Sequence, residues 1–291
     1  MVIERDLRMR IALDAHRVAQ QALAEDGTED VTSAVTVAAE QLATGALETR
    51  TAGVLAGMPY ADAVAEATGL TSLTWYHAAG SSVEPGTTIG LLQGDLRLIL
   101  RAERPLLNLL QRAVGIATLT HAFVEAVAGT RAKILHTRKT APGLRLLDVT
   151  AVLAGGGHLH RLDLGTSVMV KDNHWRALAQ SGRTLAAALD EARAKGVSDC
   201  YVEVESQEQL AEALSAGATR LLIDNQTAAT VKAWGEAARA RKPGIEIEAT
   251  GGITLENARA FAEAGADYLS IGALTHSVKA ADVSLEVRSE E

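Results

Sequence analysis

Cationic side chains gather in the middle of the sequence, at Thr137-Arg138-Lys139-Thr140, at Arg161 and at Lys171-Asp172-Asn173-His174. Residues 131–172 contain seven Lys or Arg and three Asp, whereas the whole chain has 28 basic and 36 acidic residues and a net charge of −8. A local cationic focus in an acidic protein is typical of a site for a small anionic ligand. The alternative interpretation is a solvated basic surface.

Carboxylates and glycines follow further along the chain. Glu203 and Asp224 lie at or near the ends of apolar runs, where they can hold a hydrated Mg²⁺ or the hydroxyls of a ribose. Thr250-Gly251-Gly252 and Gly272-Ala273 can bring backbone N–H groups close to a phosphate, although such glycine pairs also occur in ordinary turns. Together with the cations, these segments indicate a site for carboxylates or phosphates.

The segment 155–161, Gly-Gly-Gly-His-Leu-His-Arg, places three glycines before two histidines. A metal site at these histidines is the weaker interpretation, because no carboxylate lies at the usual ligand spacing. We expect His160 and Arg161 to face an anion instead. The single cysteine, Cys200, lies inside an apolar run and is expected in the core.

Short apolar runs recur after residue 130 and alternate with Ala-rich segments of helical character. The runs are 133–137, 166–170, 200–204, 220–224, 245–249 and 267–272, and the helical segments include 184–195, 206–216, 227–241 and 256–265. This alternation predicts parallel βα units. Because no GxGxxG or GxxxxGK[ST] motif is present, it favours a barrel over an open sheet. The polar segments follow the ends of these runs, and barrel enzymes place their active sites at the carboxyl ends of the strands.

The first part of the chain has mixed character. We expect helices at 4–25, 59–68 and 102–128, strands at 46–57 and 88–100, and a polar turn at Asp30-Val31-Thr32. The last of these helices is expected to have Pro105 near its start, an interruption at Gly115 and its end at Gly129.

Composition excludes several classes of protein. The chain has 291 residues, 47% hydrophobic and 22% charged, which is typical of a globular protein and not of a disordered or coiled-coil one. It contains no run of about 18 apolar residues that could span a membrane, and its acidic balance argues against nucleic-acid binding. The charged start at Glu4-Arg5-Asp6 lacks the apolar core of a secretion signal. With a single cysteine, we expect a cytoplasmic protein.

Taken in order, the motifs resemble quinolinate phosphoribosyltransferases, also called carboxylating nicotinate-nucleotide pyrophosphorylases. The similar segments are Glu25-Asp26 with Asp30–Ser33, Gly53–Gly57, Ala102–Arg104 with Leu107-Asn108 and Gly115–Thr118, Thr137–Thr140 with Pro142–Arg145, Gly155–Arg161, Lys171–His174, Glu203–Glu205, Leu222–Asn225, Gly251–Ile253 and Gly272–Ser277. Each motif alone is modestly specific, and the complete ordered series is what identifies the family.

The resemblance implies an α/β fold of two domains. An N-terminal α/β sandwich is expected at 1–112, with the C-terminal segment 276–291 returning to it, and an open α/β barrel of six or seven parallel strands at 113–275. The implied reaction joins quinolinate to phosphoribosyl pyrophosphate, gives nicotinate mononucleotide, pyrophosphate and CO₂, and uses Mg²⁺. Members of the family are homodimers in which the N-terminal domain of one subunit covers the barrel of the other, so Arg104 is expected in the partner's site.

The resemblance also implies roles for individual residues. Lys139, Glu203 and Asp224 are expected to be catalytic, and the two carboxylates are expected to hold Mg²⁺, largely through substrate and water. The expected substrate-binding residues are Arg104, Arg138, Lys139, His160, Arg161, Lys171, Glu203, Asp224, Thr250, Gly251, Gly252, Gly272, Ala273 and His276.

Some positions depart from the family pattern. The Asp before its TRKT motif is His136 here, and the Asn before its His-Arg pair is Leu159. Two alternatives therefore stay open: the same chemistry with another aromatic carboxylate as acceptor, and a non-catalytic anion-binding protein on the same scaffold. Glu203 and Asp224 argue against the non-catalytic alternative, because a simple anion site has no use for carboxylates beside its cations.

Overall fold

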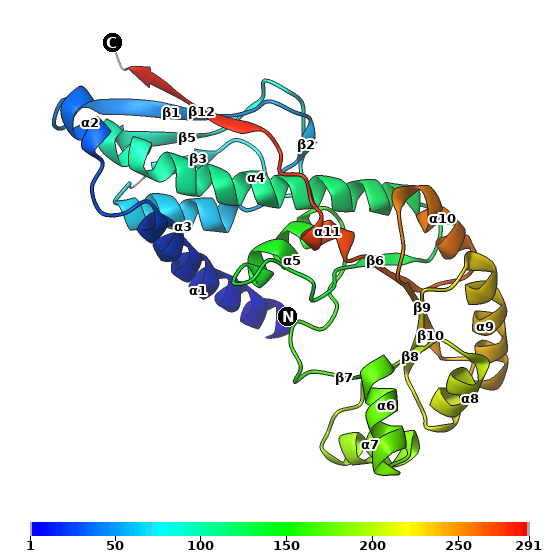
Figure 1. Ribbon diagram of the computed structural model, residues 1–291. Coiled ribbons are helices and arrows are strands. Elements are labelled where there is room, and N and C mark those ends of the chain that lie inside the picture. Colours follow the sequence, from blue (N-terminus) through cyan, green and yellow to red (C-terminus); the bar gives the residue numbers. More distant parts are fainter. Residues whose placement is uncertain (1, 71, 290–291) are drawn as a thin grey trace. The chain divides into compact units, whose positions relative to one another are not determined.

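The computed structural model describes residues 2–70 and 72–289, which form two compact units (Figure 1). The first unit contains the chain up to His121, the segment Thr140–Gly156 and the chain from Ala273 onward. The second contains Ala122–Lys139 and Gly157–Gly272. Each unit is therefore assembled from segments that are distant in the sequence. Within the described residues, no helix has both the length and the apolar character needed to cross a bilayer.

The first unit combines helices with an antiparallel sheet. Its elements are α1 (Val2–Glu25), α2 (Val31–Thr36), β1 (Leu42–Thr49), β2 (Gly53–Val54), α3 (Met58–Thr68), β3 (Ser72–Trp75), β4 (Ser82–Val83), β5 (Thr88–Asp95), most of α4 (Leu96–Ala126), α5 (Arg145–Ala154), α11 (Ala273–His276) and β12 (Val283–Ser289). The sheet order is β12-β1-β5-β3, and β2 and β4 form a separate pair. The C-terminal strand β12 thus lies beside the N-terminal strand β1, from Ala43 opposite Ser289 to Thr49 opposite Val283 (Figure 1).

The start of the chain contains a short helix where we expected a turn. Residues 31–36 form α2, and the carboxylate of Asp30 accepts the N–H of Ser33 at 3.0 Å as its N-cap. The prediction of a polar turn is therefore wrong, because capping satisfies a free N–H of the first turn and lets a helix begin there. The helices expected at 4–25 and 59–68 are confirmed as α1 and α3.

The long helix α4 also differs from the prediction. The expected strand 88–100 ends at Asp95, whose side chain accepts the N–H of Arg97 at 2.8 Å, and the helix begins at Leu96. It continues to Ala126 with Pro105 inside it and without interruption at Gly115. A Cβ at Gly115 would overlap the carbonyl oxygen of Lys279, so this glycine permits a close approach within the first unit and does not break the helix.

The segment Thr140–Gly156 belongs to the first unit through two specific contacts. Arg112 on α4 forms two 2.7 Å bonds to the buried carboxylate of Asp148 on α5. Gly155 lies against the backbone of Ala117, where a Cβ would not fit. The first compact unit therefore extends along α4 beyond residue 112, to His121, and includes α5, which packs back on that helix.

The second unit is a parallel six-stranded sheet with helical connections. It contains β6 (Lys133–Leu135), β7 (Val168–Val170), α6 (Asp172–Ser181), α7 (Leu185–Ala194), β8 (Cys200–Val204), α8 (Gln207–Ser215), β9 (Arg220–Asp224), α9 (Ala228–Arg241), β10 (Glu246–Thr250), α10 (Leu255–Glu263) and β11 (Tyr268–Ser270). The strand order is β6-β11-β10-β9-β8-β7. A parallel bridge between Leu135 and His158 extends the sheet beyond β6. The predicted alternation of strands and helices is confirmed.

The two faces of the parallel sheet differ in chemistry. One face is aliphatic and fully buried, with Val202, Leu221, Ile223, Ile247 and Leu269, as expected for a sheet covered by helices. Because strand side chains alternate, the other face carries the intervening residues, many of them polar: Tyr201, Glu203, Arg220, Leu222, Asp224, Glu246, Glu248, Thr250, Tyr268 and Ser270. This polar face leads to the carboxyl ends of the strands.

Candidate active site

A cavity of about 500 Å³ opens at the carboxyl edge of the parallel sheet. Every one of the six strands contributes to it, either with its last residues or with the loop that follows or precedes it. The lining residues are His136, Thr137, Arg138, Lys139, His160, Arg161, Met169, Lys171, Glu203, Leu222, Asp224, Asn225, Glu248, Thr250, Gly251, Gly252 and Ser270. All of them belong to the second unit.

Four cationic side chains line this cavity: Arg138, Lys139, Arg161 and Lys171. The Nε atom of Arg138 is buried and has no hydrogen-bond partner among the described residues. Burial and the nearby charge of Arg138 lower the pKa of Arg161 from its usual value. A guanidinium N–H without a partner, next to a second guanidinium, creates a positive potential that a bound anion would relieve.

Three carboxylates gather at the ends of the neighbouring strands β8 and β9. Oxygen atoms of Glu203, Glu205 and Asp224 lie within 4.8 Å of one another. Lys171 forms an ion pair with the largely buried Glu203, and the indole N–H of Trp175 donates to the Glu203 carbonyl at 2.8 Å. Burial and then the charge of Glu203 raise the pKa of Asp224. The cluster therefore retains negative charge that Lys171 only partly balances.

The loop Thr250-Gly251-Gly252 after β10 contains two consecutive glycines in the left-handed backbone region. The two glycines have φ angles of 80° and 61°, and a Cβ at Gly251 would overlap the side chain of Asn225. The N–H of Asn225 donates to the Thr250 carbonyl at 3.0 Å, while its amide donates to Asp224 at 2.7 Å. The loops after β9 and β10 are thus joined, and Asp224 is oriented by its neighbour.

Seven lining residues are not among the expected site residues: His136, Thr137, Met169, Leu222, Asn225, Glu248 and Ser270. A signal for two of them exists in the sequence. Within 246–250 and 268–270 every second residue is polar, which is the pattern of a strand with one polar face. Glu248 is thus recognisable as a polar residue near the end of its strand, but neither it nor Ser270 was assigned a role in the site.

Some expected site residues lie outside the lining of this cavity. Gly272 follows β11 in the same unit but is not among the lining residues. Arg104 lies within α4, and Ala273 and His276 are the first and last residues of α11, all in the first unit. The roles expected for these four residues stay predictions. Cys200 is fully buried at the start of β8, as expected for a core residue.

Fold and cavity together define a class of protein. A parallel βα sheet with polar side chains at its carboxyl edge is the arrangement of βα-barrel enzymes. Cationic donors beside a carboxylate cluster suit a substrate that carries several negative charges and binds with a divalent cation. The class is therefore that of βα-barrel enzymes acting on anionic substrates.

Comparison with known proteins narrows this class to one family. Residues 30–114 match the family model for the quinolinate phosphoribosyl transferase N-terminal domain, and residues 116–286 match that for the C-terminal domain. The chain belongs to the quinolinate phosphoribosyl transferase family. The resemblance drawn from the motifs is thereby confirmed.

Individual relatives agree with this assignment. A nicotinate-nucleotide pyrophosphorylase [carboxylating] of Mycobacterium leprae is 40% identical over 262 residues, 89% of this chain and 91% of the relative. A mitochondrial quinolinate phosphoribosyltransferase [decarboxylating] of Nicotiana glauca is 37% identical over 294 residues, 95% of this chain and 83% of the relative. The solved nicotinate-nucleotide pyrophosphorylase from Francisella tularensis has 31% identity and a TM-score of 0.86, over 95% of this chain and 97% of that one. The predicted α/β fold class is confirmed.

Proposed function

We propose that this protein transfers the phosphoribosyl group of phosphoribosyl pyrophosphate to quinolinate, with loss of CO₂ and pyrophosphate, and so makes nicotinate mononucleotide for NAD synthesis. One observation carries the proposal: a single cavity brings four cationic side chains next to a carboxylate cluster. The names of the relatives, carboxylating or decarboxylating enzymes of this reaction, support it.

The cations suit the acceptor substrate. Quinolinate carries two carboxylates on neighbouring ring carbons, so its site needs several positively charged donors. Arg138, Lys139, Arg161 and Lys171 supply them, and the Nε atom of Arg138 would gain the partner that it lacks. His160 borders the same space, but both of its ring nitrogens already have partners within the chain.

The carboxylates and the glycine loop suit the donor substrate. The cluster fits Mg²⁺, because three carboxylate oxygens lie within 4.8 Å of one another and their charge is incompletely balanced. Glu203 and Asp224 would hold the ion, directly or through water and ribose hydroxyls. Bound Mg²⁺ would neutralise charge on the departing pyrophosphate. Backbone N–H groups of Thr250-Gly251-Gly252 and of Gly272-Ala273 would receive the 5′-phosphate, with His276 nearby in sequence.

The residues act mainly by positioning and by charge. The ring nitrogen of quinolinate forms a bond to the ribosyl carbon while the bond from that carbon to pyrophosphate breaks. Cationic character on the ribosyl carbon is stabilised by Glu203 and Asp224, and Lys139 holds the anions in place for the attack. The carboxylate next to the ring nitrogen then leaves as CO₂. Its bonding electrons stay on the ring carbon beside the cationic nitrogen, and a proton takes its place.

We further propose a cytoplasmic homodimer with shared sites. Arg104 belongs to the first unit, whereas every residue that lines the cavity belongs to the second. In the proposed dimer, Arg104 of one subunit completes the acceptor site of the other. The cytoplasmic location rests on the single cysteine. Since the Nicotiana glauca relative is mitochondrial, fractionation of source cells is the test of location.

The decisive experiment compares two acceptors. Purified protein, Mg²⁺ and phosphoribosyl pyrophosphate are supplied with quinolinate or with nicotinate, which lacks the carboxylate next to the ring nitrogen. We expect quinolinate to be favoured by at least roughly 10³ in kcat/KM, because a single carboxylate leaves desolvated cations unpaired. Chelation of Mg²⁺ should abolish turnover. CO₂ should be released in equal amount to nucleotide.

Other outcomes identify the alternatives. His136, which lines the cavity, is fully buried, and Leu159 is 39% exposed, where the family pattern has Asp and Asn. These two departures are the reason to test other acceptors. Comparable use of nicotinate, or turnover only with another member of a panel of aromatic carboxylates, would favour a different acceptor. Binding of these anions without any turnover would favour a non-catalytic protein.

A further inference from the structure

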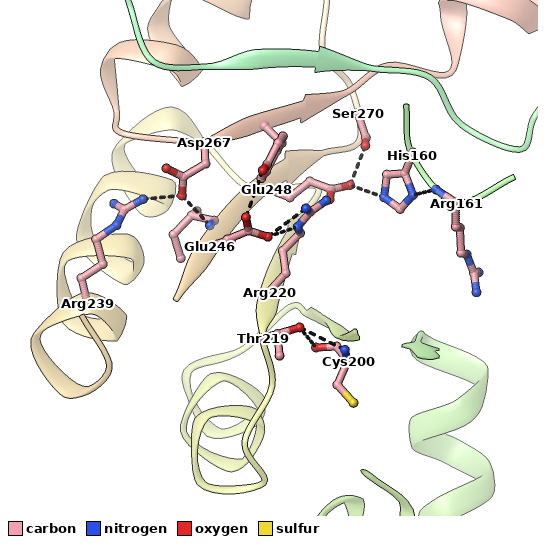
Figure 2. Close-up of polar contacts among 12 residues, drawn as sticks. His160, Arg161, Cys200, Thr219, Arg220, Arg239, Glu246, Glu248, Asp267 and Ser270 are labelled. Atoms are coloured by element: carbon pink, nitrogen blue, oxygen red, sulfur yellow. Dashed lines mark hydrogen bonds and ion pairs between the residues drawn. The ribbon is translucent and has the colours of Figure 1, made fainter. Parts of the chain in front are cut away.

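The polar face of the parallel sheet contains a charge network next to the cavity (Figure 2). Arg220, the first residue of β9, donates to Glu246 at 2.8 Å and to Glu248 at 3.0 Å. Its guanidinium carbon lies 4.5 Å from the ring centre of Tyr201 and 3.9 Å from that of Tyr268. Two carboxylates and two aromatic rings leave this guanidinium a single position. Arg220 is therefore a fixed counter-ion for Glu248.

Glu248 lies in the middle of β10 and is only 1% exposed. One of its oxygens accepts from Arg220, and the other accepts from the hydroxyl of Ser270 at 2.5 Å and faces Nε2 of His160 at 3.3 Å. Burial opposes ionisation, but the contacts with His160, Ser270 and Arg220 outweigh it and lower the pKa of Glu248. Glu248 is thus a carboxylate whose two oxygens are both engaged by the chain.

Both ring nitrogens of His160 are engaged as well. Nδ1 accepts the backbone N–H of Arg161 at 2.6 Å, so Nδ1 carries no proton. The ring proton is therefore on Nε2, which faces the Glu248 carboxylate (Figure 2). A carboxylate on one side and a backbone N–H on the other fix the tautomer and the orientation of the imidazole. The side chain is only 6% exposed, so water does not compete for these contacts.

The backbone of His160 is held from another direction by His136. The N–H of His160 donates to Nε2 of His136 at 3.0 Å, and Nδ1 of His136 lies 3.2 Å from the carbonyl oxygen of Thr137. Ring and backbone of His160 are consequently both fixed. Arg161 follows directly, is among the residues that line the cavity, and has its Nη1 atom 3.5 Å from the Ser167 carbonyl oxygen.

We infer that Glu248 is a positioning residue of the acceptor site: it holds the His160 ring, which accepts the Arg161 N–H and sets where the Arg161 guanidinium lies in the cavity. Because Arg220 balances its charge, Glu248 performs this role without cancelling the positive potential that an anion requires. The inference rests on the proposed function only for the identity of the acceptor.

The competing interpretation is that Glu248 only contributes to the packing of the sheet. A packing defect would lower the free energy of unfolding and weaken the binding of both substrates. Displacement of Arg161 instead weakens the acceptor site and leaves the donor site, formed by Glu203, Asp224 and the loop after β10, largely intact. The ratio of the two KM values therefore separates the interpretations.

Glu248→Gln is the first test, because it keeps the size of the side chain and removes its charge. We expect the KM for quinolinate to rise by about 10-fold or more, since small misplacements of a binding group can cost up to about 10²-fold. The KM for phosphoribosyl pyrophosphate should change by less than about two-fold. Equal changes in both KM values, or no change in either, would overturn the inference.

Asp267→Asn is the matched control. Asp267 also pairs with an arginine of the same unit, Arg239, at 2.8 Å (Figure 2), but it does not line the cavity. We expect this variant to lose stability and to keep both KM values within about two-fold of the wild type. A selective rise of the quinolinate KM in the control would also overturn the inference, because any lost ion pair would then have the same effect.

Two further measurements cover the case in which Glu248→Gln does not fold. Ser270→Ala removes one hydrogen bond to Glu248 and leaves its pair with Arg220, so we expect the KM for quinolinate to rise by about three-fold. Nitrogen NMR of the histidines in the free enzyme needs no turnover, and it should show His160 neutral with its proton on Nε2. A proton on Nδ1 of His160, or a Ser270→Ala enzyme with an unchanged quinolinate KM, would contradict the inference.

These readouts also separate the inference from the proposed function. A wild-type enzyme that uses quinolinate, together with variants that bind it normally, would defeat the inference alone. The proposed function alone would be defeated by a different pair of results. The wild-type enzyme would not use quinolinate, while its His160 would have the Nε2–H tautomer and the Glu248→Gln variant would lose the NMR signals of that tautomer.

Discussion

One ion pair joins the two halves of the cavity. Lys171 lies among the cations that suit the acceptor, and its partner Glu203 belongs to the carboxylate cluster that suits the donor. A divalent cation bound at the cluster would compete with Lys171 for Glu203, and the lysine would then be available to a second anion. Under the proposed function, this ion pair would link the binding of one substrate to that of the other.

Removal of a single cation from the cavity should weaken turnover without unfolding the protein. For Lys139→Ala and for Arg161→Ala we expect a loss of about 2–3 kcal/mol in kcat/KM with quinolinate, because each deletes a charge-assisted contact. The control is Lys195→Ala, which removes an exposed lysine paired with Glu191 on α7 and should leave the kinetics unchanged. Folded and kinetically normal variants at Lys139 and Arg161 would show that the pocket is wrongly assigned.

The lowered pKa of Glu248 makes a prediction about stability. A carboxyl group whose pKa is lower in the folded chain stabilises the fold above its unfolded-state pKa, and this contribution is lost as pH falls through the folded-state pKa. The difference in the free energy of unfolding between wild type and Glu248→Gln should therefore shrink as pH falls from about 6 to about 3.5. Urea titrations at both pH values measure it, and a difference that stays constant would contradict the lowered pKa.

At the scale of elements, the sequence predicts those strands and helices whose bounds are determined by the local pattern of apolar and turn residues. The strands at 200–204 and 220–224 have the expected bounds, because each is a short buried run between turn residues. Continuity of α4 through Pro105 and Gly115 was not predictable, since it depends on the packing of that helix against segments far along the chain. The site follows the same rule. Its cations were predictable because they lie in recognisable sequence motifs, whereas the roles of Glu248 and Arg220 were not, because they depend on contacts between strands.

The packing role of Gly115 can be tested directly. Alanine at an exposed position within a helix is favoured over glycine by up to about 1 kcal/mol, but at Gly115 its Cβ would overlap the Lys279 carbonyl. We expect Gly115→Ala to lower the free energy of unfolding by about 1–3 kcal/mol, as overpacking does. Gly235→Ala on α9 is the matched control, since its Cβ would meet nothing closer than 3.5 Å and should stabilise. Thermal melts of both variants measure whether each substitution raises or lowers the stability of the protein.

At the scale of the whole molecule, the two units share the chain in alternating segments. The first unit includes Thr140–Gly156 and the last strand β12 as well as the N-terminal part. The antiparallel pairing of β12 with β1 joins the two ends of the sequence, and no local pattern in either strand specifies that partner. The return of the C-terminal segment to the first unit was expected from the family resemblance alone, whereas the βα alternation of the second unit follows from the local pattern.

Sharing of sites between subunits makes a prediction about mixtures of nearly inactive proteins. In the proposed dimer each site uses Lys139 of one subunit and Arg104 of the other, so Arg104→Ala and Lys139→Ala homodimers should each keep only about 4% of wild-type activity or less. A hybrid dimer of the two has one site with neither residue and one site with both. Random exchange at equal concentrations makes half of the dimers hybrids, each with one intact site of two, so the mixture should recover about a quarter of wild-type activity. Activity should appear at the rate at which subunits exchange, followed with differently tagged chains. A mixture that exchanges subunits and stays nearly inactive would mean that each site draws both residues from one chain, because no hybrid could then contain a complete set.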